Sequence, residues 1–313
     1  MLYGLSGRDC TIIVSNWSSY ASDGRATEVP WLVMPLVREI AVPLSFFTVP
    51  VKSVGADTYA TIATGVVPPR NLSATFFLQA SHLTNPVLFP FMERPIGGFP
   101  PFYKQRLRVA FVNPFVAGSF VVIDIPEAVP TRWEFQARGN NPATVSITWS
   151  FKTANLIDTT LPVLSAVNPN DEFITIRSIA LNFDPPHVPP HGIVGADVRI
   201  NAPVTWRHRV GISPVKVAND FSINRWDVEL QLTLSPDAVL WLGRNIEFQP
   251  NTGVYQIMMT IYPEEGVPTT FLFYSARLGE GNTSVRVEGA LEATVSLRAL
   301  DFSYGIPERE EEG

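Results

Sequence analysis

The sequence predicts a mainly β protein built from two tandem β-sandwich or β-barrel domains, each with one short flanking helix and long loops. Three observations support this fold class. Apolar and polar residues alternate in many segments, several segments recur at a nearly fixed spacing, and only one type of helix signal is repeated along the chain.

The composition excludes several other classes of protein. The chain has 313 residues, of which 46% are hydrophobic and 17% are charged, and its net charge is −6. This apolar fraction is too high for a disordered chain. The longest nearly uncharged apolar stretch covers the 15 residues 109–123 and contains a proline and a glycine, whereas a membrane-spanning helix needs about 20 residues. The single cysteine, Cys10, excludes an internal disulfide, and the N-terminus has no secretory signal pattern.

An internal duplication defines the expected domains. ATVSI at 143–147 matches ATVSL at 293–297 with an offset of 150, which also relates 106–111 to 256–261 and 120–125 to 270–275. Residues 76–88 match 228–240 with an offset of 152, and residues 37–44 match 176–183 with an offset of 139. The increase of 13 in the offset predicts an insertion in the second copy, in the proline-rich segment 183–196. We expect a first domain at 1–155, a linker at 156–170 and a second domain at 171–313.

The predicted strands follow the alternation of apolar and polar residues. In the first copy Phe76, Leu78 and Ala80 alternate, and Trp133, Phe135 and Ala137 alternate with charged residues and Gln136. In the second copy the apolar positions are Val228, Leu230, Leu232, Leu234, Val285 and Val287. This period of two is typical of strands with one buried face. Each copy should end in a strand, at 144–151 and at 294–302.

Short helices and turns are predicted between these strands. Asn85 before Pro86, and Ser235 before Pro236, are good helix starts, and Gly243 suits a helix end. Glu264 and Glu265 before Gly266 indicate a hairpin tip rather than a glycosidase carboxylate pair, because adjacent strand residues point apart. Residues 279–281, Gly-Glu-Gly, indicate a turn.

No motif indicates catalysis or a cofactor. The sequence lacks nucleophile elbows, phosphate-binding loops and HExxH motifs. His187 and His191 have the spacing of a helical zinc pair, but the prolines around them prevent a helix. We therefore expect a protein that is not an enzyme and binds no metal or cofactor.

The order of elements in the second copy resembles the tail tube protein (major tail protein) family of long-tailed bacteriophages. A strand at 196–201, a long polar loop at 202–223, an alternating strand at 225–234, a helix and hairpin at 236–261 and two closing strands carry the resemblance, and the duplication extends it to the first copy. The resemblance implies a structural virion protein of the tail, assembled in the host cytoplasm, whose rings stack into a tube for genome delivery. Two copies per chain imply trimeric, pseudo-hexameric rings. The implied partners are the chain itself, the tape measure protein and double-stranded DNA in the lumen, and the tail terminator and tail tip proteins, with no membrane insertion.

The resemblance also suggests contacts between rings or subunits. The candidate residues are Arg207, Arg209, Lys216 and Asp220 in the long loop, Glu264 and Glu265 at the hairpin tip, and Glu310 and Glu311 in the acidic tail. Residues 1–152 hold 12 basic and 9 acidic residues (+3), and residues 153–313 hold 11 and 20 (−9), which would place opposite charges side by side in a ring. The alternatives are a carbohydrate-binding or carbohydrate-hydrolysing β-sandwich, or another virion component such as a capsid-decorating or baseplate protein.

Overall fold

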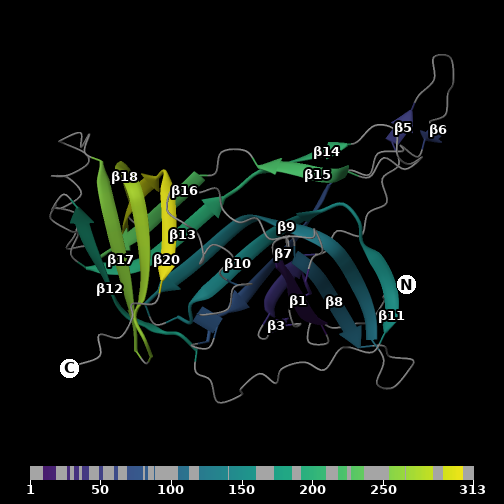
Figure 1. Cartoon of the computed structure of the whole chain (residues 1–313). Helices are drawn as coiled ribbons and strands as arrows, with labels where there is room; N and C mark the ends of the chain where they lie inside the picture. The colour runs from purple at the N-terminus through teal and green to yellow at the C-terminus, as the bar shows by residue number, and fades with distance from the viewer. Residues whose placement is uncertain are drawn as a thin grey trace.

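Antiparallel β-strands make up nearly all of the chain for which a structure can be described (Figure 1). The computed structural model describes residues 10–18, 27–28, 32–34, 37–41, 49–51, 60–62, 69–79, 82–83, 88, 105–112, 120–139, 141–159, 173–184, 192–208, 218–223, 227–235, 254–264, 266–284 and 292–305. The predicted mainly β fold class is confirmed. Within these ranges there is no helix of the length and apolarity that crossing a bilayer requires.

Among the described residues, the first half of the chain contains eleven strands and the second half nine. The strands of the first half are β1 (Cys10–Ser18), β2 (Thr27–Glu28), β3 (Leu32–Met34), β4 (Val37–Ala41), β5 (Val49–Val51), β6 (Ala60–Ile62), β7 (Arg70–Phe77), β8 (Gln105–Val112), β9 (Phe120–Arg138), β10 (Thr144–Phe151) and β11 (Asn155–Thr159). Those of the second half are β12 (Ile176–Asp184), β13 (Ile193–Asn201), β14 (Val204–His208), β15 (Ala218–Ile223), β16 (Asp227–Leu234), β17 (Tyr255–Pro263), β18 (Thr269–Ser284), β19 (Glu292–Ala299) and β20 (Asp301–Gly305).

One central sheet runs through both halves of the chain. Its strand order is β4-β7-β10-β9-β13-β16-β19-β18, where β9 and β18 contribute their C-terminal parts. The N-terminal part of β9 pairs instead with β8 and β11, and β8 pairs with β1, which forms a first wing. The N-terminal part of β18 pairs with β17 and β20, and β17 pairs with β12, which forms a second wing. Two long strands therefore connect the central sheet to its wings.

The pairing scheme of the first half recurs in the second half in the same chain order. The pairs β1–β8, β4–β7, β7–β10, β9–β10, β8–β9 and β9–β11 correspond to β12–β17, β13–β16, β16–β19, β18–β19, β17–β18 and β18–β20. The hairpin β5–β6 lies between β4 and β7 in the chain, as the hairpin β14–β15 lies between β13 and β16. Each of the nine described strands of the second half thus has a counterpart in the first half by its partners, whereas β2 and β3, which pair with β1, have none among the described strands.

One of the sequence matches relates the wrong strands. Residues 37–44 and 176–183 fall on β4 and β12, but β4 pairs with β7 whereas β12 pairs with β17, so the counterpart of β12 is β1. The interval from β1 to β4 is longer than that from β12 to β13, which contradicts an insertion in the second copy at this point. Three of the other matches fall on strands with corresponding partners. The match of 76–88 with 228–240 joins the end of β7 to β16, but it is out of register by four residues, because Thr75 and Gln231 hold matching positions. Short apolar strands resemble one another, and this resemblance produced the wrong match.

The core lies between the central sheet and the two wings, on one face of the central sheet. The predicted alternation is confirmed on β16, where Val228, Leu230, Leu232 and Leu234 are buried, and on β9, where Trp133, Phe135 and Ala137 are buried. The Trp133 ring packs on Phe302 of β20 at 6.1 Å between centroids, and the Phe135 ring packs on Phe271 of β18 at 5.2 Å. The apolar core is continuous across both halves because the second wing packs beneath a strand of the first half.

The predicted turns have different outcomes. Glu264 lies in the turn of the hairpin between β17 and β18, as expected, and Gly266 there has φ of 103°, which favours glycine. The segment 279–281 is not a turn but part of β18, where the register shifts between Leu278 and Gly281. Glycine suits such a bulge because the local backbone departs from regular pleating.

Several other predictions lie outside the described residues. The two predicted helix starts, at 85–86 and at 236, and the predicted strand at 285–287 fall there, although residues 82–83 form a single 3-10 turn. Strand β11 overlaps the start of the predicted linker, and residues 160–172 are not described.

Candidate functional site: the polar face and edges of the central sheet

The face of the central sheet opposite the wings is polar. Alternation along each strand places apolar side chains toward the wings and polar ones on the other face. We call this other surface the polar face. Its residues include Ser73, Thr75, Glu134, Gln136, Ser146, Thr148, Asp197, Arg199, Glu229, Gln231, Thr294, Ser296 and Arg298, which the strand registers place side by side.

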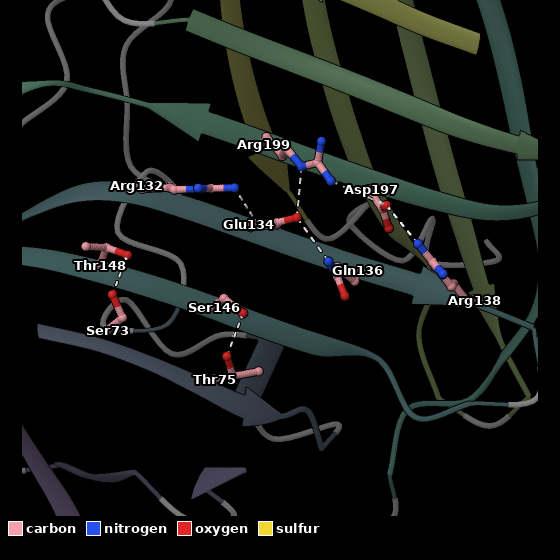
Figure 2. Close-up of polar contacts among 10 residues, drawn as sticks. All are labelled: Ser73, Thr75, Arg132, Glu134, Gln136, Arg138, Ser146, Thr148, Asp197 and Arg199. Carbon is pink, nitrogen blue, oxygen red and sulfur yellow. Dashed lines mark hydrogen bonds and ion pairs between the residues drawn. The ribbon is translucent and has the colours of Figure 1, made fainter. Parts of the chain in front are cut away.

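Hydroxyl pairs cross-link β7 and β10 on the polar face (Figure 2). Ser73 Oγ and Thr148 Oγ1 are 2.9 Å apart, and Thr75 Oγ1 and Ser146 Oγ are 2.8 Å apart. Such hydrogen-bonded pairs of opposite residues stabilise adjacent strands and fix their register. This part of the face carries no charge.

A cluster of charges lies on the polar face where the two halves meet. We call the paired segments of β9 and β13 the seam. Glu134 Oε1 accepts hydrogen bonds from Arg199 Nε at 2.8 Å and Gln136 Nε2 at 3.0 Å, and Oε2 accepts one from Arg132 Nη2 at 3.1 Å (Figure 2). Asp197 Oδ2 accepts a hydrogen bond from Arg138 Nη2 at 3.3 Å. The Arg199–Glu134 pair at 2.8 Å and the Arg138–Asp197 pair at 3.3 Å each join one half of the chain to the other, whereas Arg132 and Glu134 lie on the same strand.

The two carboxylates at the seam differ in electrostatic environment. Both are nearly buried, with 11% of the Glu134 side chain and 5% of the Asp197 side chain exposed. Burial raises the pKa of Glu134, but hydrogen bonds from Arg199 and Gln136 outweigh it, so the pKa lies below its usual value. Burial dominates at Asp197 and raises its pKa despite the nearby arginines, and its Oδ1 has no hydrogen-bond partner among the described residues.

The central sheet ends in two strand edges that correspond to the two sides of the seam. Within the described ranges, β4 pairs only with β7, and residues 277–284 of β18 pair only with β19. By their partners, β4 is the counterpart of β13, and residues 277–284 are the counterpart of the C-terminal part of β9. The two edges therefore correspond to β13 and β9, the two strands that pair with each other at the seam.

A second charged cluster lies on the first wing. Asp124 Oδ1 accepts hydrogen bonds from Arg106 Nε at 3.1 Å and from Arg108 Nε at 2.8 Å, and Oδ2 accepts one from Arg106 Nη2 at 3.0 Å. Burial raises the pKa of Asp124, but these hydrogen bonds and charges outweigh it and lower the pKa overall. All three residues lie on paired strands of one half, so this cluster braces the wing internally.

The structure places only some of the candidate contact residues. Arg207 on β14 and Asp220 on β15 are opposite each other in the hairpin register. Glu264 is exposed, and its Oε2 accepts a hydrogen bond from Thr175 Oγ1 of the same chain at 3.0 Å. The remaining candidates, Arg209, Lys216, Glu265, Glu310 and Glu311, lie outside the described residues.

Sequence reasoning missed the seam residues. Glu134 and the arginines beside it alternate with buried aromatic residues, which indicated only a wet strand face. Asp197 and Arg199 alternate in the same way on β13. Two strands that both carry acidic and basic residues at a spacing of two are a signal for cross-strand ion pairs, but only the strand partners reveal it.

The described residues contain no group of three or more His, Cys, Asp or Glu side chains placed to hold a metal ion. His82 is buried, and its Nδ1 accepts a hydrogen bond from the backbone N–H of Gln79 at 3.2 Å. His187 and His191 lie outside the described residues.

No protein-family model matches this chain, and no curated protein matches it.

Proposed function

We propose that this chain is a structural protein whose copies join through the edges of the central sheet. The repeated pairing scheme carries this proposal, because β13 pairs with β9 inside the chain while their counterparts lie at the two ends of the sheet. An open strand edge presents N–H and C=O groups that another chain can pair with. Head-to-tail pairing of the two edges would repeat the seam between copies.

Head-to-tail contacts form either a closed ring or an open filament. Both wings pack on the same face of the central sheet. If the joined sheets of several copies close into a ring, the wings therefore fit only on its outer side. The polar face would then line the inside of the ring. Arginine and carboxylate groups offset one another on this face, which suits DNA that passes through without being held, because clustered cations would retain phosphates.

Within this class we propose a tail tube subunit of a long-tailed bacteriophage. Three chains would supply six copies of the fold per ring, and stacked rings would form the virion tube that guides double-stranded DNA into the host. The duplicated strand order and the resemblance of the second copy to this family support the assignment. In this role the chain performs no catalysis, and its partners are further copies, the tape measure protein and the proteins at the two ends of the tail.

Electron microscopy of the purified full chain tests the proposal. We expect rings with three-fold symmetry that stack into hollow tubes. Rings of six chains would refute the assignment of two fold copies per chain. A stable monomer that binds oligosaccharides would refute the tube function and favour the carbohydrate alternative.

A further inference from the structure

The corner where β10 turns into β11 is covered by a residue from the other half of the chain. Trp206 of β14 donates a hydrogen bond from Nε1 to Ser150 Oγ at 2.8 Å. Lys152 Nζ lies 6.0 Å from the centroid of the Trp206 ring. Ser150 and Lys152 are each only 5% exposed. Trp206 follows β13 in the chain, and β13 pairs with β9. The pairing at the seam therefore also positions Trp206 over the corner.

The corresponding corner of the second half carries an exposed leucine. Leu300 lies between β19 and β20, and its backbone N–H donates to the carbonyl oxygen of Tyr274 at 3.1 Å. Ser150 is opposite Asn71 of β7, and Leu300 follows Ala299, which is opposite Val228 of β16. The offset of 150 that relates β10 to β19 also relates Ser150 to Leu300. Leu300 is 59% exposed, whereas its counterpart is buried.

The difference follows from what is missing at the second corner. Trp206 lies on β14, which directly follows β13 in the chain. The counterpart of β13 is β4, which lies at the far end of the central sheet of the same chain. No strand of the same chain pairs with residues 277–284 on the side where β13 would be needed, among the residues described. The second corner therefore lacks the neighbour that covers the first.

We infer that the Leu300 corner is a docking site for a second copy of this chain. In this arrangement β4 of the second copy pairs antiparallel with residues 277–284 of β18, and the hairpin β5–β6 of that copy, the counterpart of β14–β15, covers Leu300. The inference rests on the proposed function and names the surface through which its rings form. Leu300 takes the place of Ser150, which accepts the hydrogen bond from Trp206 at the inner corner, so this contact is driven by burial rather than by a hydrogen bond.

The seam also fixes the expected register between copies. Gln136 is opposite Asp197 across the seam. Asn282 takes the place of Gln136, because it is opposite Thr294 as Gln136 is opposite Thr144. Glu39 takes the place of Asp197, because Thr75 and Gln231 hold matching positions on β7 and β16. Asn282 of one copy should therefore be opposite Glu39 of the next.

Sedimentation velocity of the full chain over a concentration series tests the docking site. We expect Leu300→Ser to raise the concentration needed for half-assembly by about tenfold, since about 1.4 kcal/mol of lost burial corresponds to a factor of ten. Urea unfolding of the monomer should be unchanged because Leu300 is exposed there. Val267→Ser, at an exposed apolar residue of the β17–β18 turn, serves as the matched control and should assemble normally. If Leu300→Ser assembles like the unchanged chain, the docking site is wrong while the tube function stands.

Disulfide formation between copies tests the register. The full chain with Glu39→Cys, Asn282→Cys and Cys10→Ser should form a ladder of covalently joined chains on oxidation. In the control chain Glu39 is unchanged and the second cysteine is introduced as Leu156→Cys, on the edge strand β11. This chain should form no ladder. Tubes that form without this cross-link would overturn the register, and a chain that never assembles would overturn the proposed function itself.

Discussion

Neutralising Glu134 and Asp197 separately should have unequal effects on stability, although the two carboxylates lie on neighbouring strands of the same seam. Glu134→Gln removes the negative charge that pairs with the Arg199 guanidinium at 2.8 Å and leaves a neutral amide oxygen as the acceptor. A hydrogen bond to a charged group contributes about 1.5–3 kcal/mol, and the bond from Arg199 persists in weakened form without the ion pair, so the substitution should cost about 1.5 kcal/mol. Arg132 adds little to this figure because its side chain is 52% exposed.

Asp197→Asn should change the free energy of unfolding by less than about 0.5 kcal/mol. The folded protein already disfavours the Asp197 carboxylate, since burial raises its pKa and its Oδ1 lacks a hydrogen-bond partner among the described residues. Replacing it with a neutral amide removes the cost of burying a charge and offsets the lost hydrogen bond from Arg138. Each substitution replaces a carboxylate with an amide of nearly the same shape, so each variant serves as a control for the other.

The pH dependence of urea unfolding separates the two effects further. The pKa of Glu134 is lowered in the folded state, so its stabilisation is present above the unfolded pKa and is lost as the pH falls through the folded pKa. The pKa of Asp197 is raised, so the unchanged chain should gain stability relative to Asp197→Asn as the pH falls through that folded pKa. Tryptophan fluorescence is a suitable signal because Trp133 is buried beside the seam. Equal losses in both variants, or parallel pH profiles, would refute this account of the seam.

Three other substitutions test the contacts that hold the fold. Asp124→Asn should cost about 2–4 kcal/mol near neutral pH, measured by urea unfolding, because it removes the charge that binds two arginines of β8; the lowered pKa predicts that this loss shrinks as the pH falls through the folded value. Trp206→Phe should cost about 1 kcal/mol through the lost hydrogen bond to Ser150, and Ser150→Ala in the same background should add little, which a double-mutant cycle checks. Phe302→Leu should cost about 1–2 kcal/mol in calorimetry because it removes ring contacts with three aromatic neighbours, and an unchanged unfolding profile would contradict the role of this cluster.

Periodicity was sufficient to find individual strands but not their partners. The alternation at 228–234 predicted β16 correctly because each residue reports locally on which face is buried. Pairing depends on which distant segment supplies the neighbouring edge, and the pattern of a single strand contains little of that information. The mistaken match of 37–44 with 176–183 shows the consequence, since β4 and β12 have similar apolar patterns but different partners.

The seam could not be predicted for a related reason. On β9 the residues Arg132, Glu134, Gln136 and Arg138 indicated an exposed face, and the structure confirms that they share one face, yet Glu134 is nearly buried. Neighbouring side chains on β13 cover it, and the sequence gives no local sign of that cover. The duplication was the more informative observation, because it is a relation between distant segments and so carries information about pairing.

The charges at the seam also change how the unequal charges of the two halves should be interpreted. Residues 1–152 carry +3 and residues 153–313 carry −9, which predicted attraction between the halves through their net charges. At the seam each half contributes both signs, with Arg138 and Glu134 on β9 facing Asp197 and Arg199 on β13. Pairs at 2.8–3.3 Å depend on register, whereas attraction between net charges is long-ranged and insensitive to it. Specific alignment of the two halves therefore rests on local pairs and the apolar core beneath them, and the net charge difference can only assist their approach.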